Sequence, residues 1–183
     1  MKRQNQHARR AASFKPRGYD GWYAKRKFNR AFEYREGQGV PADPAEAFRL
    51  TAEAARAGHH AAVLNMGWYY LDGIGVEADI DQARSWYRKS ARQGDPRAML
   101  GLAIIEMEAG RFDLAAEWLR RAIAEDHADA RFVLGKLYWR GRGVPMDRKL
   151  AMVLFTEAAR AKVPEAQRVI RFFTYLKKRA RRR

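Results

Sequence analysis

The side chains best suited to chemistry are few and lie far apart in the sequence. The four histidines are His7, His59, His60 and His127, and none belongs to an H-E-x-x-H pair. Cysteine is absent, which excludes a disulfide framework and a thiolate metal site. A structural zinc site needs about four converging ligands, and no such set is visible. We therefore expect no metal or cofactor, and we expect His59 and His60, in a turn between repeats, to be exposed to solvent.

Nucleophile and phosphate-binding motifs are also missing. The three serines, Ser13, Ser85 and Ser90, lack the context of a nucleophile elbow. A G-x-G-V motif occurs, but it lacks the Lys-Ser/Thr pair of a phosphate loop and precedes a capped helix without following a strand. No two carboxylates have a spacing that argues for acid–base catalysis. The sequence therefore predicts a protein that is not an enzyme and has no small-molecule substrate.

Three aspartates follow the G-x-G-V motifs at a fixed distance. They are Asp43, Asp79 and Asp147. The glycines suit a loop that ends one helix and starts its antiparallel partner, because such a loop needs left-handed backbone angles. A carboxylate just after it accepts hydrogen bonds from the free amides of the next helix and favours its dipole. We interpret these acids as helix caps rather than as catalytic or metal-binding groups.

The elements that position these side chains recur along the chain as a helix, a glycine loop and a second helix. Eight positions recur at an offset of 36 residues: Tyr34, Gly37, Gly39, Val40, Asp43, Ala47, Ala55 and Gly58 match Tyr70, Gly73, Gly75, Val76, Asp79, Ala83, Ala91 and Gly94. A third long copy runs from Leu134 to Ala159, and a shorter copy from Leu102 to Ala124 has an AGRFD turn instead of the glycine motif. Repeats of this period indicate a solenoid, since each helix pair needs neighbours to bury its apolar face.

From Ala62 to Gly94 the chain nearly completes the pattern A-x-x-x-L-G-x-x-Y-x-x-G-x-G-V-x-x-D-x-x-x-A-x-x-W-Y-x-x-A-A-x-x-G. On these residues it resembles the Sel-one-like repeat family, a branch of the tetratricopeptide superfamily. The short third unit is more similar to a plain tetratricopeptide repeat, and the first departs from the pattern with Arg30 and Ala31 in place of Leu-Gly. The resemblance implies an all-α, right-handed α-solenoid of antiparallel helix pairs, with four repeats and a C-terminal capping helix. It also implies a scaffold for protein–protein interactions of the kind found in bacteria.

The expected organisation has three parts: a basic flexible arm over residues 1–18, the solenoid over 19–163, and a capping helix with a basic tail over 164–183. The first helix is predicted at Tyr19–Glu36, and the second helices at about 44–57, 80–93, 113–125 and 148–161. In the last segment Ala166, Val169, Ile170 and Phe173 form an i, i+3, i+4, i+7 stripe. We expect this stripe to dock on the fourth repeat.

The predicted partner-binding surface lies on the first helices, which line the concave face of tetratricopeptide-like solenoids. The residues at these positions, together with Leu100, are Leu64, Trp68, Leu71, Asp72, Ile104, Met107, Phe132, Lys136, Trp139 and Arg140. They predict an apolar, aromatic groove with a basic end, suited to a protein or to an amphipathic or extended peptide. Trp68 and Trp139 are the preferred contacts, because each adjoins a tyrosine and two adjacent helix residues do not both face the core. The alternative for the Leu and Ile positions is packing between neighbouring first helices.

The formal net charge of +16 is concentrated at the two ends. Residues 1–30 hold ten Lys or Arg and one acid, and so do residues 160–183. The candidate polyanion-binding residues are Arg9, Arg10, Lys15, Arg17, Lys177, Lys178, Arg179, Arg181, Arg182 and Arg183. They predict nucleic-acid binding without sequence preference as the second hypothesis. An anionic membrane is a further candidate partner for the C-terminal helix, and basic tails that only aid solubility are the simplest alternative.

The expected location is the cytoplasm. The absence of cysteine fits a reducing compartment, and no apolar stretch has the length of a signal core or a membrane span. An Arg-rich N-terminus also suits a mitochondrial transit peptide, but with one serine and no clear apolar face this is the less favoured interpretation.

Overall fold

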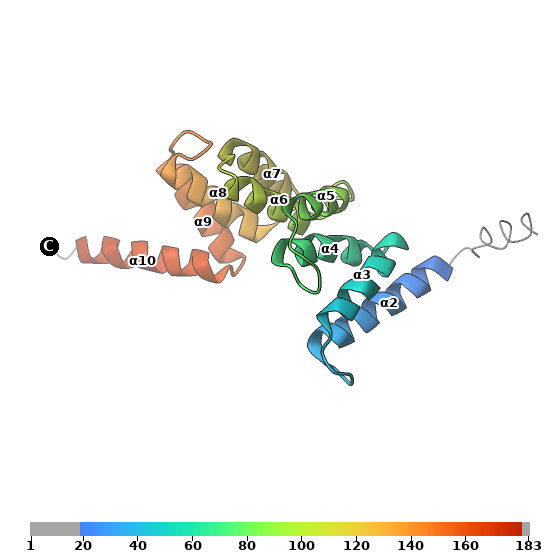
Figure 1. Ribbon diagram of the computed structural model, residues 1–183. Coiled ribbons are helices and arrows are strands. Elements are labelled where there is room, and N and C mark those ends of the chain that lie inside the picture. The colour runs from blue at the N-terminus through green and yellow to red at the C-terminus, as the bar shows by residue number, and fades with distance from the viewer. Residues whose placement is uncertain (1–18, 181–183) are drawn as a thin grey trace, which may run out of the picture. The chain divides into compact units, whose positions relative to one another are not determined.

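The computed structural model describes residues 19–180, and this stretch is built of α-helices without a β-strand (Figure 1). Its helices are α2 (Tyr19–Glu36), α3 (Pro44–Arg56), α4 (His60–Asp72), α5 (Ile80–Ala91), α6 (Pro96–Glu108), α7 (Phe112–Ala124), α8 (Ala128–Arg140), α9 (Arg148–Arg160) and α10 (Pro164–Ala180). The first helix has the predicted bounds, and the second helices α3, α5, α7 and α9 end within two residues of the predicted positions. The predicted basic arm lies outside the described residues. Over the described range no helix is both long and apolar enough to cross a bilayer.

The three aspartates after the glycine loops are helix caps, as predicted. Oδ1 of Asp43, Asp79 and Asp147 each accepts a hydrogen bond from the backbone N–H three residues further on, at 3.0, 2.9 and 2.9 Å respectively. Each carboxylate therefore satisfies an amide that the first helical turn leaves free. This contact explains the fixed spacing without any catalytic role.

The second glycine of the loop motif has a role in packing that the sequence did not indicate. A Cβ added to Gly75 would lie 2.0 Å from the carbonyl oxygen of Pro44, and one added to Gly143 would lie 2.2 Å from the carbonyl carbon of Phe112. The loop of one repeat therefore rests on the start of the second helix of the preceding repeat. In the first repeat, a Cβ on Gly39 would meet nothing within 4 Å.

His59 is half-buried and not fully exposed, so the expectation for this residue was wrong, whereas His60 is exposed as expected. The Nδ1 of His59 accepts a hydrogen bond from the Ala62 N–H at 3.3 Å and thereby caps α4. Its ring stacks on Phe28 of α2 at a centroid distance of 4.4 Å. Burial, with smaller contributions from His60 and a nearby lysine, lowers the pKa of His59. His127 caps α8 in the same way.

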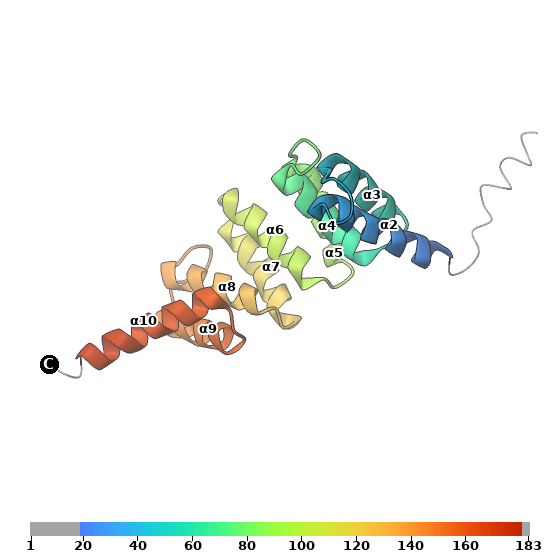
Figure 2. The ribbon, with the colours of Figure 1, turned by 90° about the horizontal axis from the view of Figure 1, so that it is seen from below.

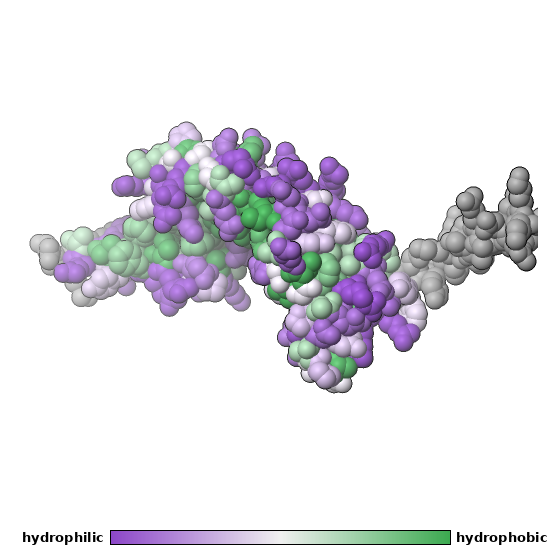
Figure 3. Space-filling model, viewed as in Figure 1, coloured by the Kyte–Doolittle hydropathy of each residue, from purple (hydrophilic) through white to green (hydrophobic). Residues whose placement is uncertain are grey.

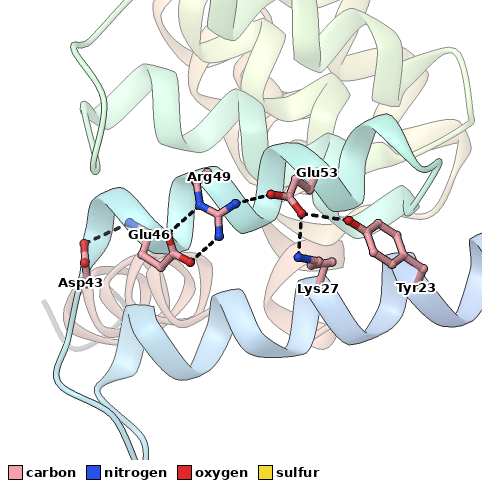
Figure 4. A network of polar contacts seen from close by, with 6 residues as sticks. All are labelled: Tyr23, Lys27, Asp43, Glu46, Arg49 and Glu53. Carbon is pink, nitrogen blue, oxygen red and sulfur yellow. Dashed lines mark hydrogen bonds and ion pairs between the residues drawn. The ribbon is translucent and has the colours of Figure 1, made fainter.

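The residues divide into two compact units, the first ending at Trp86 and the second beginning at Tyr87. In the first unit, α3 packs against α2 and α4 around a core that includes Ala54, Val63 and Met66. A polar network also joins α2 to α3 (Figure 4). In it, Glu53 Oε2 accepts from the Tyr23 hydroxyl at 3.0 Å and lies 2.8 Å from Lys27 Nζ. The hydrogen bond from Lys27 is the main reason that the pKa of Glu53 is lowered.

In the second unit α6 pairs with α7, α8 with α9, and α10 packs on α9. Helices α8 and α9 cross closely at Gly135, where an added Cβ would lie 2.7 Å from the ring of Phe155. Ala158, Val163 and Ala166 form the buried contact between α9 and α10, which confirms that the last segment docks on the fourth repeat. The C-terminal half of α10 extends past α8 and α9 (Figures 1 and 2). These packed helix pairs confirm the all-α prediction.

Candidate partner-binding groove

The predicted partner-binding residues all lie on sides of the first helices that the core leaves at least partly accessible. Half-buried are Leu64, Trp68, Leu71, Leu100, Met107, Phe132, Lys136 and Trp139; exposed are Asp72, Ile104 and Arg140. Met66, Leu102 and Leu134 occupy the buried sides of the same three helices, α4, α6 and α8. The leucine and isoleucine positions are therefore not fully enclosed by neighbouring helices, and Ile104 is 38% exposed.

Four of the predicted residues come together at one hollow in the second unit, with a volume of about 640 Å³. We call it the α8–α10 groove; it is lined by Phe132, Lys136, Trp139 and Arg140 of α8, Phe155 of α9, and Arg168, Val169, Phe172 and Phe173 of α10. The other predicted residues lie elsewhere: Leu64, Trp68, Leu71 and Asp72 on α4, and Leu100, Ile104 and Met107 on α6. The structure thus joins the α8 residues into a site and leaves the rest outside it.

Aromatic rings in contact with one another form the apolar part of the groove. The Trp139 ring centroid lies 5.2 Å from that of Phe173 and 6.4 Å from that of Phe155. Phe132 contacts Phe155 from the other side, at 5.5 Å. Because Phe155 is buried and Trp139 is half-buried, these rings are held by the packing of three helices. They therefore offer a preformed apolar surface, which is the usual character of a binding cleft.

The edges of the groove are cationic. Lys136 Nζ lies 5.7 Å from the centre of the Phe132 ring, and Arg140 is exposed at the end of α8. Among residues 19–180, neither side chain forms an ion pair. On the opposite wall, Arg168 Nη2 lies 2.9 Å from Glu165 Oε1, an exposed pair one turn apart. No acidic side chain is among the groove-lining residues. The groove is thus apolar with cationic edges, whereas the prediction placed such a surface along the first helices of three repeats.

The α10 wall was missing from the sequence prediction of the site. Arg168 and Phe172 lie 36 residues after Phe132 and Lys136, the same offset that relates the first two repeats. Applying that offset once more would have placed them beside the α8 residues. The sequence interpretation instead used α10 only as a cap, because its docking stripe was the stronger pattern.

Trp68, the other preferred contact, lies in the first unit. Its ring is 5.6 Å from that of Tyr69, and the Arg35 guanidinium lies 5.5 Å from its centre. Tyr69 is buried, whereas Trp68 is half-buried, which agrees with the expectation that only one of the two neighbours faces the core. Trp68 remains an accessible aromatic residue, but it does not line the α8–α10 groove.

A second hollow, of about 920 Å³, lies along α2 and includes Trp22 and Leu50. Two of its four lining cations are paired with acids, Lys27 with Glu53 and Arg30 with Glu33. Its lining includes the acid Glu33, so its charge is mixed, whereas the lining of the α8–α10 groove contains no acid.

The described residues contain no group of three His, Cys, Asp or Glu side chains arranged to hold a metal ion. Of the predicted polyanion-binding residues, Lys177, Lys178 and Arg179 are exposed in the last turn of α10, and the others lie outside residues 19–180. In Figure 3, hydrophobic residues in green and hydrophilic residues in purple lie beside one another along α10, at the left of the view. The chemistry that these surfaces offer is binding.

Comparisons with known proteins agree with the repeat pattern. The family model for the Sel1 repeat matches residues 27–59, 60–95, 96–127 and 128–163. A Sel1 repeat protein from Oxalobacter formigenes is 31% identical, with a TM-score of 0.74 over 84% of this chain and 64% of that one. A protective antigen of uropathogenic Escherichia coli with an SLR fold is 28% identical, with a TM-score of 0.71 over 83% of this chain and 36% of that one. The chain therefore spans less than two thirds of either structure. Among curated proteins, no sequence matches significantly.

Proposed function

Because the chain belongs to the Sel1 repeat family, we propose that it is a non-enzymatic adaptor whose α8–α10 groove binds a protein or peptide partner. Sel1 repeat proteins are generally scaffolds for protein interactions. The observation that carries the proposal for this chain is the groove itself, in which two first-helix walls, α8 and α10, present aromatic side chains around an open volume. Peptide-binding clefts take apolar anchors in this manner.

The size of the groove supports a short helical or extended segment as its occupant. From Phe132 to Arg140, α8 advances about 12 Å, or roughly two helical turns. A partner helix of this length would place two or three side chains on one face into the groove. The exposed aromatic Phe172 gives that face a contact on the opposite wall.

Site-specific photocrosslinking tests the proposal, and the chain offers a matched pair of positions. Phe172 and Tyr175 are aromatic residues on the same helix, 58% and 59% exposed, but only Phe172 lines the groove. A benzoylphenylalanine at position 172 is expected to capture a protein partner in cells, and one at position 175 is expected to capture much less. The captured protein should remain after nuclease treatment. Equal crosslinking at both positions, or its loss with nuclease, would refute groove binding.

Nucleic-acid association through the basic ends is the second candidate function. It is favoured by the exposure of Lys177, Lys178 and Arg179 on the part of α10 that extends past α8 and α9 (Figure 2). Deleting residues 1–18 and 177–183 is then expected to abolish retention on RNA at low salt and to leave groove crosslinks intact. Unchanged retention after the deletion would exclude the basic ends as the polyanion-binding surface.

A further inference from the structure

We infer that the α8–α10 groove selects an acidic partner: an amphipathic segment with a bulky apolar anchor and carboxylates next to it on the same face. This inference rests on the proposed function and adds the chemistry of the partner. It follows from the charge of the groove and from a comparison of the repeats with one another.

The repeats are an internal control for which residues stacking requires. Equivalent positions lie 36 residues apart from α2 to α4, from α4 to α6 and from α8 to α10, and 32 residues apart from α6 to α8. Residue types that stacking demands recur at equivalent positions, as the buried Ala62, Ala98, Ala130 and Ala166 do. A residue type found in one copy alone is not needed for the fold.

All three cations of the groove depart from the types found in the other first helices. Arg168 of α10 stands where α2, α4, α6 and α8 carry Phe28, Leu64, Leu100 and Phe132. Lys136 of α8 stands where α2, α4 and α6 carry Phe32, Trp68 and Ile104. Arg140 of α8 stands where the same helices carry the acids Glu36, Asp72 and Glu108. Stacking is therefore compatible with apolar or acidic residues at all three positions, and at these positions positive charge occurs only in the groove.

The surroundings of these cations leave them available to a ligand. Within residues 19–180, Lys136 and Arg140 have no acidic partner, and Arg168 has only its exposed pair with Glu165. Lys136 and Arg140 lie one turn apart on α8 and face in similar directions. Carboxylates one turn apart on a partner helix match this spacing. The aromatic rings between the two walls supply the site for the anchor next to those carboxylates.

Three synthetic helical peptides separate charge selection from groove binding. They share one Trp and one Leu anchor, and the flanking positions on the anchor face are all Glu, all Gln or all Lys. Fluorescence anisotropy with the full chain is expected to give about tenfold tighter binding of the Glu peptide than of the Gln peptide, from three partly exposed ion pairs. Added salt should reduce this difference.

The decisive variant reverses the charges: Lys136→Glu, Arg140→Glu and Arg168→Glu together. It should bind the Lys peptide more tightly than the Glu peptide, while Arg160→Glu, an exposed arginine on α9 outside the groove, should keep the wild-type order. Circular dichroism checks that both variants are folded. If the triple variant still prefers the Glu peptide, the preference comes from charge elsewhere on the chain and the inference fails.

Failure of the inference and failure of the proposed function have different signatures. If Phe172→Ala weakens all three peptides and Tyr175→Ala weakens none, groove binding stands; equal affinities for the three peptides would then overturn only the acidic preference. If no peptide binding depends on Phe172, both fall. An RNA oligonucleotide that binds the wild type and not the triple variant would instead assign the groove to nucleic acid and overturn the inference.

Discussion

The contact of each glycine loop with the preceding repeat makes one substitution series especially informative. Gly39, Gly75 and Gly143 occupy the same place in three copies of the loop and have similar φ values of 72°, 68° and 65°. Replacing each with alanine imposes the same left-handed backbone on an L-residue. The added methyl meets backbone atoms of the preceding repeat only at Gly75 and Gly143.

The expected costs follow from these two contributions. A non-glycine residue in the left-handed region costs about 1–2 kcal/mol, partly offset because alanine restricts the unfolded chain by about 0.4–1 kcal/mol. Gly39→Ala should therefore lose about 1 kcal/mol or less. At Gly75 the new Cβ would lie 2.0 Å from the Pro44 oxygen, so the loop must move by more than an ångström. Overpacking of this kind adds about 1–3 kcal/mol, and Gly75→Ala and Gly143→Ala should each lose about 3 kcal/mol in total.

Urea unfolding followed by circular dichroism measures these losses. Repeat proteins can unfold in parts, so amide exchange of α3 and α4 for Gly75→Ala, and of α7 and α8 for Gly143→Ala, shows whether the loss is local. Peptide binding should weaken only where the disturbance reaches α8. Gly143→Ala, in the loop that follows α8, should therefore weaken it, and Gly75→Ala should not.

Equal losses at all three positions would refute this reasoning. They would mean that backbone conformation alone explains the glycines and that the loop does not bear on the preceding helix. A loss at Gly39 as large as at Gly75 would have the same consequence, because nothing lies within 4 Å of a Cβ at Gly39.

Three further predictions concern pH and backbone strain. The lowered pKa of His59 means that the unfolded chain binds its proton more tightly, so the stability that it contributes is full above about pH 6.5 and is lost as pH falls through the lowered pKa. His59→Asn keeps a cap acceptor and should make the urea midpoint independent of pH in this range. It should also cost about 1–2 kcal/mol at neutral pH, because the ring contact with Phe28 is lost. The lowered pKa of Glu53 has the same effect at lower pH: its contribution to stability is full above about pH 4.5 and is lost as pH falls further. Glu53→Gln should remove this pH dependence. Lys162 has a φ of 67°, so Lys162→Gly should raise the free energy of unfolding by about 0.5 kcal/mol in thermal unfolding. Asp126→Gly should not raise it, because aspartate tolerates a φ of 60° and Asp126 pairs with Arg131.

The helix pairs and their caps were predictable because they depend on residues close in sequence. A glycine that ends α4 and an aspartate that starts a helix act through backbone atoms three or four residues away. Their spacing therefore appears directly in the sequence. The position of His59 was misjudged because its exposure depends on Phe28, about thirty residues earlier and on another helix.

The groove was predicted only on one side for the same reason. The four α8 residues follow from helix periodicity within one repeat, but the opposite wall belongs to α10, which a loop and the whole of α9 separate from α8. The contact of Trp139 with Phe173 joins the walls, and neither residue alone indicates the other. The close approach of Gly75 to Pro44 is likewise a contact between repeats. The motif therefore indicated the left-handed backbone of Gly75 but not the residue that it contacts.

Function in a repeat protein is therefore better indicated by where the copies differ than by where they agree. The shared alanines and glycines specify how helices stack, and any partner that they alone could recognise would bind every copy equally. Arg140 breaks the series of acids Glu36, Asp72 and Glu108 at a position where exposure removes any packing constraint on charge. An exposed residue free of packing constraint still influences what binds next to it, because like charges across an interface repel and opposite charges attract. At these three positions only the α8–α10 groove carries lysine or arginine, so the groove differs from the equivalent places on the other first helices in the charge of the ligand that it favours.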